Sequence, residues 1–196
     1  MLVKFDFKPG INREGTQLTA GTGWYDGDKI RFRKGRAEQI GGWQKYSTNT
    51  FLGICRSLLD WVAAASIEYL GVGTNLKFYV NQGDAYFDVT PIRETTAAGD
   101  VTFSAVNGSS TLTVADVNHG AIVNDFVTFS GAVSLGGNIT AAVLNQEYEI
   151  ATIIDGNSYT VAAKDTAGAA VTANASDTGN GGASVVGAYQ INTGLN

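Results

Sequence analysis

The sequence has almost none of the residues that form covalent crosslinks or bind transition metals. It contains a single cysteine, Cys55, which excludes an internal disulfide and a zinc site built from cysteines. Its single histidine, His119, excludes a site built from several histidines. We therefore expect no metal and no cofactor. Because Cys55 lies within an apolar run, we expect it to be a small buried hydrophobic residue.

Long apolar segments are also missing. No apolar run approaches the roughly 18–20 residues that a membrane-spanning helix requires, so no membrane insertion is expected. The N-terminal residues MLVKFDFKPG lack the uninterrupted apolar region of a secretion signal, which indicates folding in a cytosol. Only two prolines occur, against 25 glycines and frequent Thr, Ser, Asn and Val. This composition favours an all-β fold of short strands joined by tight turns.

Positive charge is scarce in the second half of the chain. Residues 1–95 carry twelve Lys and Arg against ten Asp and Glu, a net charge of +2. Residues 96–196 carry one basic residue against eight acidic ones, a net charge of −7. A general nucleic-acid binder is therefore excluded, and only the first half could face phosphate, over a limited area.

The basic residues concentrate in the stretch Gly21–Trp43, which also holds two of the three tryptophans. Residues 28–33 alternate charged side chains with Ile30 and Phe32, which predicts a strand with one apolar face. A turn at Lys34 and Gly35 would return the chain as a second strand. The stretch is therefore predicted to form a β-hairpin with a basic face and aromatic anchors at both ends.

Residues 51–91 consist of apolar runs of about five to eight residues separated by turn residues. This spacing predicts an antiparallel meander, as in a propeller blade or a barrel. A helix over residues 56–70 is the rival interpretation, because that segment has no Gly or Pro and its apolar residues lie near helical spacing. The turn-rich neighbouring segments favour a pair of strands.

Composition changes across residues 91–100, which we interpret as a linker. In the segment that follows, strands flanking Asn107 and Gly108 and a second pair flanking 155–157 predict hairpins. We expect residues 100–164 to form a compact β-barrel or sandwich. The predicted organisation is a propeller-like β body over 1–95, an inserted β-barrel or sandwich module over 96–183, and a strand over 184–196 that returns to the body.

No arrangement of residues predicts catalysis. Asp84 and Asp88 would lie about 13 Å apart along one strand, too far for a glycosidase pair. Asp26 and Asp28 lack the rest of a calcium loop, and His119 occupies an expected turn with no nucleophile motif nearby. Phosphate-binding glycine loops are absent as well.

The basic cluster of the hairpin is the feature that most favours a function. A solvated strand face neutralised by neighbouring acids is one interpretation. The other is an electrostatic contact with DNA phosphates or with an acidic subunit. The candidate contact residues are Lys29, Arg31, Arg33 and Arg36. The candidate packing or interface residues are Trp24, Trp43 and Trp61.

The opening stretch, PGINREGTQLTAGTGWYDGDKIRFRKGRAEQIGGWQK, resembles the start of tail nozzle or hub proteins of short-tailed bacteriophages, also described as packaged-DNA stabilisation proteins. The segments FLGICRSLLDW, YLGVGTNLKFYV and YFDVTPIR are similar to the continuation of the same family. The stretch DVTFSAVNGSSTLTVADVNHGAIVNDFVTFSG resembles a β module that many such phage proteins carry. The resemblance covers nearly the whole chain.

The resemblance implies a partial β-propeller-like meander with an inserted module, in a hexameric ring below the portal and adaptor. Proteins of this family are not enzymes. They close the DNA exit channel after packaging and conduct the genome at ejection. Because family members are longer, we expect this chain to be truncated or completed by another chain.

The sequence therefore supports two candidate functions. The first is a structural subunit of the virion tail, assembled in the host cytoplasm, with transient contact to phage DNA that is independent of sequence. The alternative is a carbohydrate- or receptor-binding β module on the virion surface, which would require exposed aromatic side chains. The aromatic residues available for it are Phe103, Phe126, Phe129, Tyr148 and Tyr159.

Overall fold

The computed structural model describes residues 8–16, 18, 23–42, 44–176 and 180–193. The chain divides into two compact units, Met1–Tyr46 and Ser47–Asn196. The strand expected near the N-terminus, over residues 2–7, lies outside the described residues.

The first unit contains the predicted hairpin. Strand β1 (Ile30–Arg33) pairs antiparallel with β2 (Arg36–Gln39). The two residues between them, Lys34 and Gly35, have φ values of 49° and 77°. Positive φ at both central positions defines a type I′ turn, whose twist matches that of the flanking strands. None of the described residues of this unit is buried.

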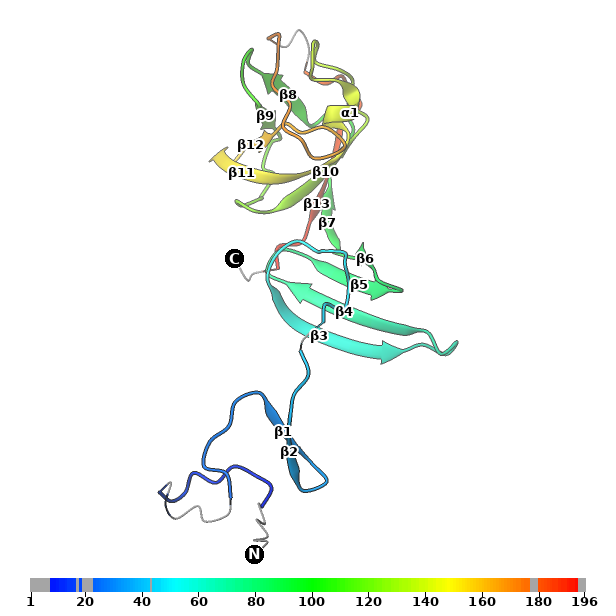
Figure 1. The fold of residues 1–196 in the computed structure, drawn as a ribbon. Helices are drawn as coiled ribbons and strands as arrows, with labels where there is room; N and C mark the ends of the chain where they lie inside the picture. The colour runs from blue at the N-terminus through cyan, green and yellow to red at the C-terminus, as the bar shows by residue number, and fades with distance from the viewer. Residues whose placement is uncertain (1–7, 17, 19–22, 43, 177–179, 194–196) are drawn as a thin grey trace, which may run out of the picture. The chain divides into compact units, whose positions relative to one another are not determined.

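The second unit begins with a four-stranded antiparallel sheet in sequence order (Figure 1). Its strands are β3 (Cys55–Val62), β4 (Glu68–Thr74), β5 (Phe78–Gln82) and β6 (Ala85–Asp88). The predicted meander is therefore present, and the rival helix over residues 56–70 is wrong. That segment forms β3 and the start of β4, which are linked by a tight turn in which Ser66 has φ of 58°.

A seven-stranded antiparallel sheet in the order β7-β13-β10-β11-β12-β9-β8 makes up the rest of this unit. The strands are β7 (Ile92–Thr95), β8 (Thr102–Ala105), β9 (Thr111–Ala115), β10 (Phe126–Ser130), β11 (Glu147–Asp155), β12 (Ser158–Ala162) and β13 (Val186–Gln190). The predicted hairpins β8–β9 and β11–β12 are both confirmed. A short helix, α1 (Ala141–Leu144), begins after Thr140, whose hydroxyl accepts from the Val143 N–H.

Strand β11 turns the corner of this sheet (Figure 1). Its first residues, 147–149, pair with β10, whereas residues 150–155 pair with β12 and contain two register shifts. Such irregularities bend a strand and let it pass from one layer to the next. The bend brings Phe103 of β8 within 4.9 Å of Phe129 of β10, although three strands separate β8 from β10 in the sheet order. The cluster of buried apolar residues runs from Val101 to Tyr189 and fills this fold.

The all-β prediction is confirmed, and the described residues form open antiparallel sheets, with no closed barrel among them. One local expectation is wrong, because residues 92–95 of the expected linker form strand β7. Strand β13 pairs with β7 and β10 in the seven-stranded sheet. The domain boundaries stay a prediction.

Candidate interaction surfaces

The hairpin of the first unit separates its basic residues into paired and unpaired ones. The Arg31 Nε donates to the Glu38 carboxylate at 2.6 Å across the two strands. Arg33 and Arg36 lie directly opposite each other at the turn, and no acidic partner faces either of them among the described residues. Like charges in this position oppose strand pairing. The end of the hairpin near the turn is therefore an uncompensated cationic site.

Among its described residues, the first unit contains a second ion pair and a further unpaired cation. Arg13 and Asp26 form an exposed ion pair at 2.5 Å, and the Arg13 hydrogen bond lowers the pKa of Asp26. The backbone N–H of Gly27 also donates to this carboxylate. Lys29, the fourth predicted contact residue, has a positive φ of 55° and no ion-pair partner among the described residues.

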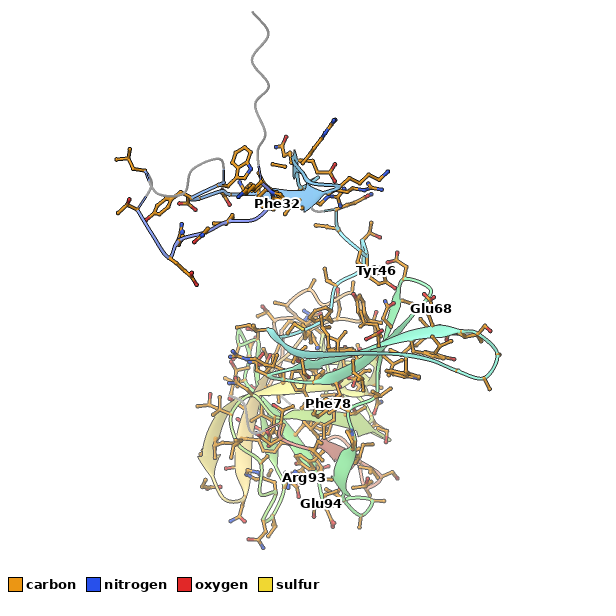
Figure 2. The ribbon with its side chains drawn as sticks, turned by 90° about the horizontal axis from the view of Figure 1, so that it is seen from below. Phe32, Tyr46, Glu68, Phe78, Arg93 and Glu94 are labelled. Atoms are coloured by element: carbon orange, nitrogen blue, oxygen red, sulfur yellow. The ribbon has the colours of Figure 1, made fainter. Side chains whose placement is uncertain are left out.

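Two of the three predicted aromatic anchors lie in described segments. Trp24 is partly buried, with its ring centroid 6.3 Å from that of Phe32 in the hairpin. Phe32 is labelled in Figure 2. Trp61 stacks on Tyr69 across β3 and β4, at 5.5 Å between centroids and 15° between planes. Trp43 lies outside the described residues. The packing roles of these tryptophans stay predictions.

One face of the four-stranded sheet is apolar and uncovered. The strand register places Leu59, Gly71, Val80 and Phe87 in one row across the four strands. The large side chains exposed on this face are Leu59, Trp61, Phe78, Phe87 and Val89. Leu59 and Phe87 are 68% and 54% exposed, and Phe78 is labelled in Figure 2. We call this the open face.

Glycines shape the open face. A Cβ atom on Gly71 would lie 3.1 Å from the Trp61 ring, and one on Gly73 would lie 2.4 Å from the Ser57 Oγ. The indole ring can therefore lie flat over the strand because Gly71 carries no side chain. This arrangement gives a smooth surface of aromatic and aliphatic groups, typical of a surface that another protein covers.

The opposite face of the same sheet is covered by the chain itself over β5 and β6, whereas Leu58 and Val62 of β3 stay exposed on that side. Phe51 packs against Tyr79 and Tyr86, at 5.9 and 5.1 Å between ring centroids. The Tyr79 hydroxyl accepts from the Leu52 N–H at 3.3 Å. Val72 and Tyr79 are buried on this side. The two faces of one sheet therefore differ in that only one has its cover within the described chain.

A buried lysine joins the two sheets of the second unit. Lys77, only 2% exposed, places its Nζ 2.6 Å from Asp88 of β6 and 2.6 Å from Glu147 of β11. The same Nζ lies 4.3 Å from the centre of the Phe126 ring. The Gln190 amide donates to Glu147 at 2.8 Å.

We call this contact between the two sheets the Lys77 junction. The pKa values of Lys77 and Asp88 follow from its ion pairs. Burial acts to lower the pKa of Lys77, but hydrogen bonds from its ammonium to Asp88 and Glu147 outweigh burial and leave the pKa raised. Burial likewise acts to raise the pKa of Asp88, and bonds from Lys77 and Thr90 leave it lowered. Lys77 and Asp88 are therefore both charged at neutral pH. This site could not be predicted from the sequence, because nothing in a lone lysine within the apolar run LKFYV marks it as buried.

A second polar cluster lies in the core of the seven-stranded sheet. The Tyr189 hydroxyl donates to Asp116 at 2.5 Å and lies 2.8 Å from the Tyr159 hydroxyl. Burial raises the pKa of Asp116 and those of both tyrosines. His119 stands edge-on to Tyr159 at 5.0 Å between ring centroids.

His119 has a structural role here. Its Nδ1 accepts from the Ala121 N–H at 3.0 Å, so its Nε2 carries the proton and donates to the Asp155 carbonyl at 3.1 Å. Both ring nitrogens are thereby occupied, and the ring is 4% exposed. A histidine in this state has no free nitrogen for general base catalysis.

The aromatic residues considered for receptor binding are all buried. Tyr148 and Tyr159 are fully enclosed, and Phe103, Phe126 and Phe129 are nearly so. An open hollow of about 340 Å³ beside Tyr148 is lined by Asn124, Tyr148, Glu149, Ile150, Ala151, Ala162 and Lys164. The Tyr148 hydroxyl turns away to donate to the Val143 carbonyl. None of the five rings therefore offers a stacking surface for a sugar.

Other site chemistry is limited. Cys55 is exposed on the outer strand β3, so the expectation that it is buried is wrong. The described residues contain no group of three or more His, Cys, Asp or Glu placed to hold a metal ion. None of the described helices is long and apolar enough to cross a bilayer.

Comparisons with known proteins place the chain in no family. No family model matches the sequence, and no curated protein matches it. Among solved structures, the fold is similar to a chain described as phage phi92 endosialidase, with 18% sequence identity and a TM-score of 0.35. The match covers 79% of this chain and 21% of that chain, so this chain spans about a fifth of that protein's length.

Proposed function

We propose that the chain is a structural subunit of a bacteriophage tail, of the nozzle or hub type, that works within a homo-oligomeric ring. The observation that carries this proposal is the open face of the four-stranded sheet. Leu59, Trp61, Phe78 and Phe87 stand exposed together there, whereas the other face of the sheet is packed over β5 and β6. A contiguous aromatic and aliphatic surface on a folded sheet is typical of a protein–protein interface.

The first unit supports the same function. None of its described residues is buried, so the described part of this unit contains no core that would stabilise it alone. The cationic end of its hairpin, with Arg33 opposite Arg36, fits an acidic tail protein or the phosphates of phage DNA. Contact with DNA through so few charges would be weak, salt-dependent and independent of sequence.

In this role the protein acts through shape and charge. Aromatic side chains are buried between neighbouring subunits, and the ring continues the DNA exit channel below the portal and adaptor. The acidic second half, with one basic residue against eight acidic ones, would repel DNA phosphates and let the genome pass without adhering. The resemblance of the opening stretch to nozzle and hub proteins supports a hexamer located in the virion tail.

Electron microscopy of the purified full chain tests this proposal. We expect rings, formed by the chain alone or after addition of the phage portal and adaptor. A second arm compares the Arg33→Glu/Arg36→Glu variant with Lys45→Glu, an exposed charge of the same unit outside the hairpin. The hairpin variant should lose assembly or genome retention, and the control should keep both. A chain that stays monomeric with portal and adaptor present would contradict the proposal.

A further inference from the structure

Strand β3 has an open edge. It is the outer strand of its sheet, pairs only with β4, and all eight of its residues are exposed. The backbone hydrogen bonds that described residues make outside the sheets do not reach Leu58, Asp60 or Val62. A long, apolar and uncovered edge strand is a template for pairing with another chain.

The backbone geometry shows which residues of β3 face outward. The Ala63 N–H donates to the Ile67 carbonyl at 2.9 Å, so these two residues form a hydrogen-bonded pair. Hydrogen-bonded and non-bonded pairs alternate along an antiparallel ladder. Ser57, Leu59 and Trp61 therefore bond to β4, and Leu58, Asp60 and Val62 direct their N–H and C=O groups to the open edge.

We propose that this edge pairs with β3 of a second copy of the chain, antiparallel, with Leu58 of both copies at the two-fold axis. In this register Arg56 of each copy lies opposite Asp60 of the other, so one contact contains two ion pairs. The side chains of both charged residues are exposed and free of ion pairs among the described residues. The edge is thus complementary to itself in charge.

Other two-fold registers lack this complementarity. Centring the pair on Arg56 or on Asp60 places like charges opposite each other, which is unfavourable. Centring it on Ser57 or Leu59 places both charges opposite apolar side chains. A register shift between Cys55 and Ser57 makes Arg56 the extra residue of a bulge, so the regular β3–β4 ladder runs from Ser57 to Val62 and Arg56 lies at its end.

A two-fold contact also explains how such an edge avoids open-ended association. Each copy covers the other's edge, and no pairing surface on β3 remains after two copies have joined. The two sheets become one continuous sheet of eight strands whose open faces adjoin. This inference concerns the strand edge and does not depend on the proposed ring.

Disulfide trapping tests the register directly in the full chain. Cys55→Ser removes the only native thiol, and Leu58→Cys is then added. Paired residues at the axis would lie about 5.5 Å apart at Cα, within the range that a disulfide bridges. The matched control is Cys55→Ser/Val62→Cys, which keeps both ion pairs, because the two copies of residue 62 would be separated by eight residues along the strands, about 26 Å. We expect a dimer on non-reducing gels for the first variant and monomer for the second.

Charge exchange gives the second arm. Arg56→Asp alone and Asp60→Arg alone each place two like-charge pairs in the contact, so sedimentation velocity should show a dimer dissociation constant raised roughly tenfold. The double variant Arg56→Asp/Asp60→Arg restores opposite charges and should restore the dimer. Circular dichroism confirms that each variant is folded.

Three results would overturn the proposal. They are equal trapping of the two cysteine variants, no trapping of Leu58→Cys, and failure of the double variant to recover dimerisation. Rings assembled from a chain that gives any of these results would leave the proposed tail function intact, so the two proposals fail separately.

Discussion

The two sheets of the second unit differ in how they bury their side chains. The seven-stranded sheet bends at β11 and closes over a core in which Phe129, Tyr148 and Leu144 are almost completely buried. The four-stranded sheet packs only one face and leaves Leu59 and Phe87 exposed on the other. Both sheets have apolar residues on both faces of some strands, so composition does not separate them. The difference is that one sheet completes its core alone, whereas the other leaves an apolar face exposed, which we propose that a second protein covers.

A pair of Phe→Ala substitutions should show this difference with the largest effect. Phe129→Ala removes a ring that is 1% exposed and packed against Phe103, and should cost about 3–5 kcal/mol of unfolding free energy. Phe87→Ala, on the open face, should change it by less than about 0.5 kcal/mol in dilute protein. Urea denaturation measures both. Equal costs would show that the open face is already packed.

The Lys77 junction should be nearly as sensitive. Lys77→Met leaves Asp88 and Glu147 close together without their cation, and should destabilise the protein by about 3–5 kcal/mol. The variant Lys77→Met/Asp88→Asn/Glu147→Gln removes all three charges and should recover most of that loss. If the neutral triple variant is as unstable as the single one, packing of the lysine stem and not its charge holds the junction.

Asp116 should make the stability of the folded protein depend on pH. Because burial raises the pKa of Asp116 in the fold, the folded state holds its proton to higher pH than the unfolded state. This contribution favours folding at low pH and is lost as pH rises from the ordinary aspartate value through the raised one. Asp116→Asn, which can still accept from Tyr189, should therefore gain stability relative to wild type over that window, by up to about 1 kcal/mol.

Melting temperatures of the two proteins in buffers from pH 3.5 to 7 measure this difference. The Asp88 carboxylate acts in the opposite direction, since its lowered pKa gives stability that is lost as pH falls below its ordinary value. That contribution is common to both proteins and cancels in the comparison. Parallel curves for wild type and variant would show that Asp116 does not titrate abnormally.

The smallest effect is expected at the hairpin. Arg33→Gln removes a like-charge pair with Arg36 and should stabilise the hairpin by a few tenths of a kcal/mol. The control Arg31→Gln breaks an exposed ion pair with Glu38 and should destabilise it by a similar amount. Temperature-dependent amide chemical shifts of β1 and β2 report both changes. Effects of the same sign would contradict the assignment of paired and unpaired arginines.

The sequence predicted local structure more accurately than it predicted which residues are buried. Turns at Lys34–Gly35 and Asn107–Gly108 were both predicted, and Gly35 and Gly108 have positive φ. The second turn was expected to hold two residues with positive φ, but Asn107 has none and five residues separate β8 from β9. Strand β7 was missed because residues 92–95 lack apolar alternation and are exposed, so the pairing with β13 defines the strand. Cys55 was expected to be buried because its neighbours are apolar, but they lie on an uncovered edge strand.

For the candidate sites too, the sequence showed the local pattern of residues but not the contacts between distant segments. The basic cluster was visible as a run of residues, whereas its separation into the paired Arg31 and the opposed Arg33 and Arg36 required the strand register. The Lys77 junction joins residues 77, 88 and 147, and no local pattern connects them. Contacts between distant segments depend on how sheets pack, which a period-two pattern does not specify.

Hydroxyl-radical footprinting of the full chain, dilute and assembled, tests the central claim that another protein chain covers the open face. We predict that oxidation of Trp61, Phe78 and Phe87 falls sharply on assembly. The buried Phe129 and Tyr148 should be unreactive in both the dilute and the assembled protein. Unchanged oxidation of the open face in assembled particles would contradict the claim.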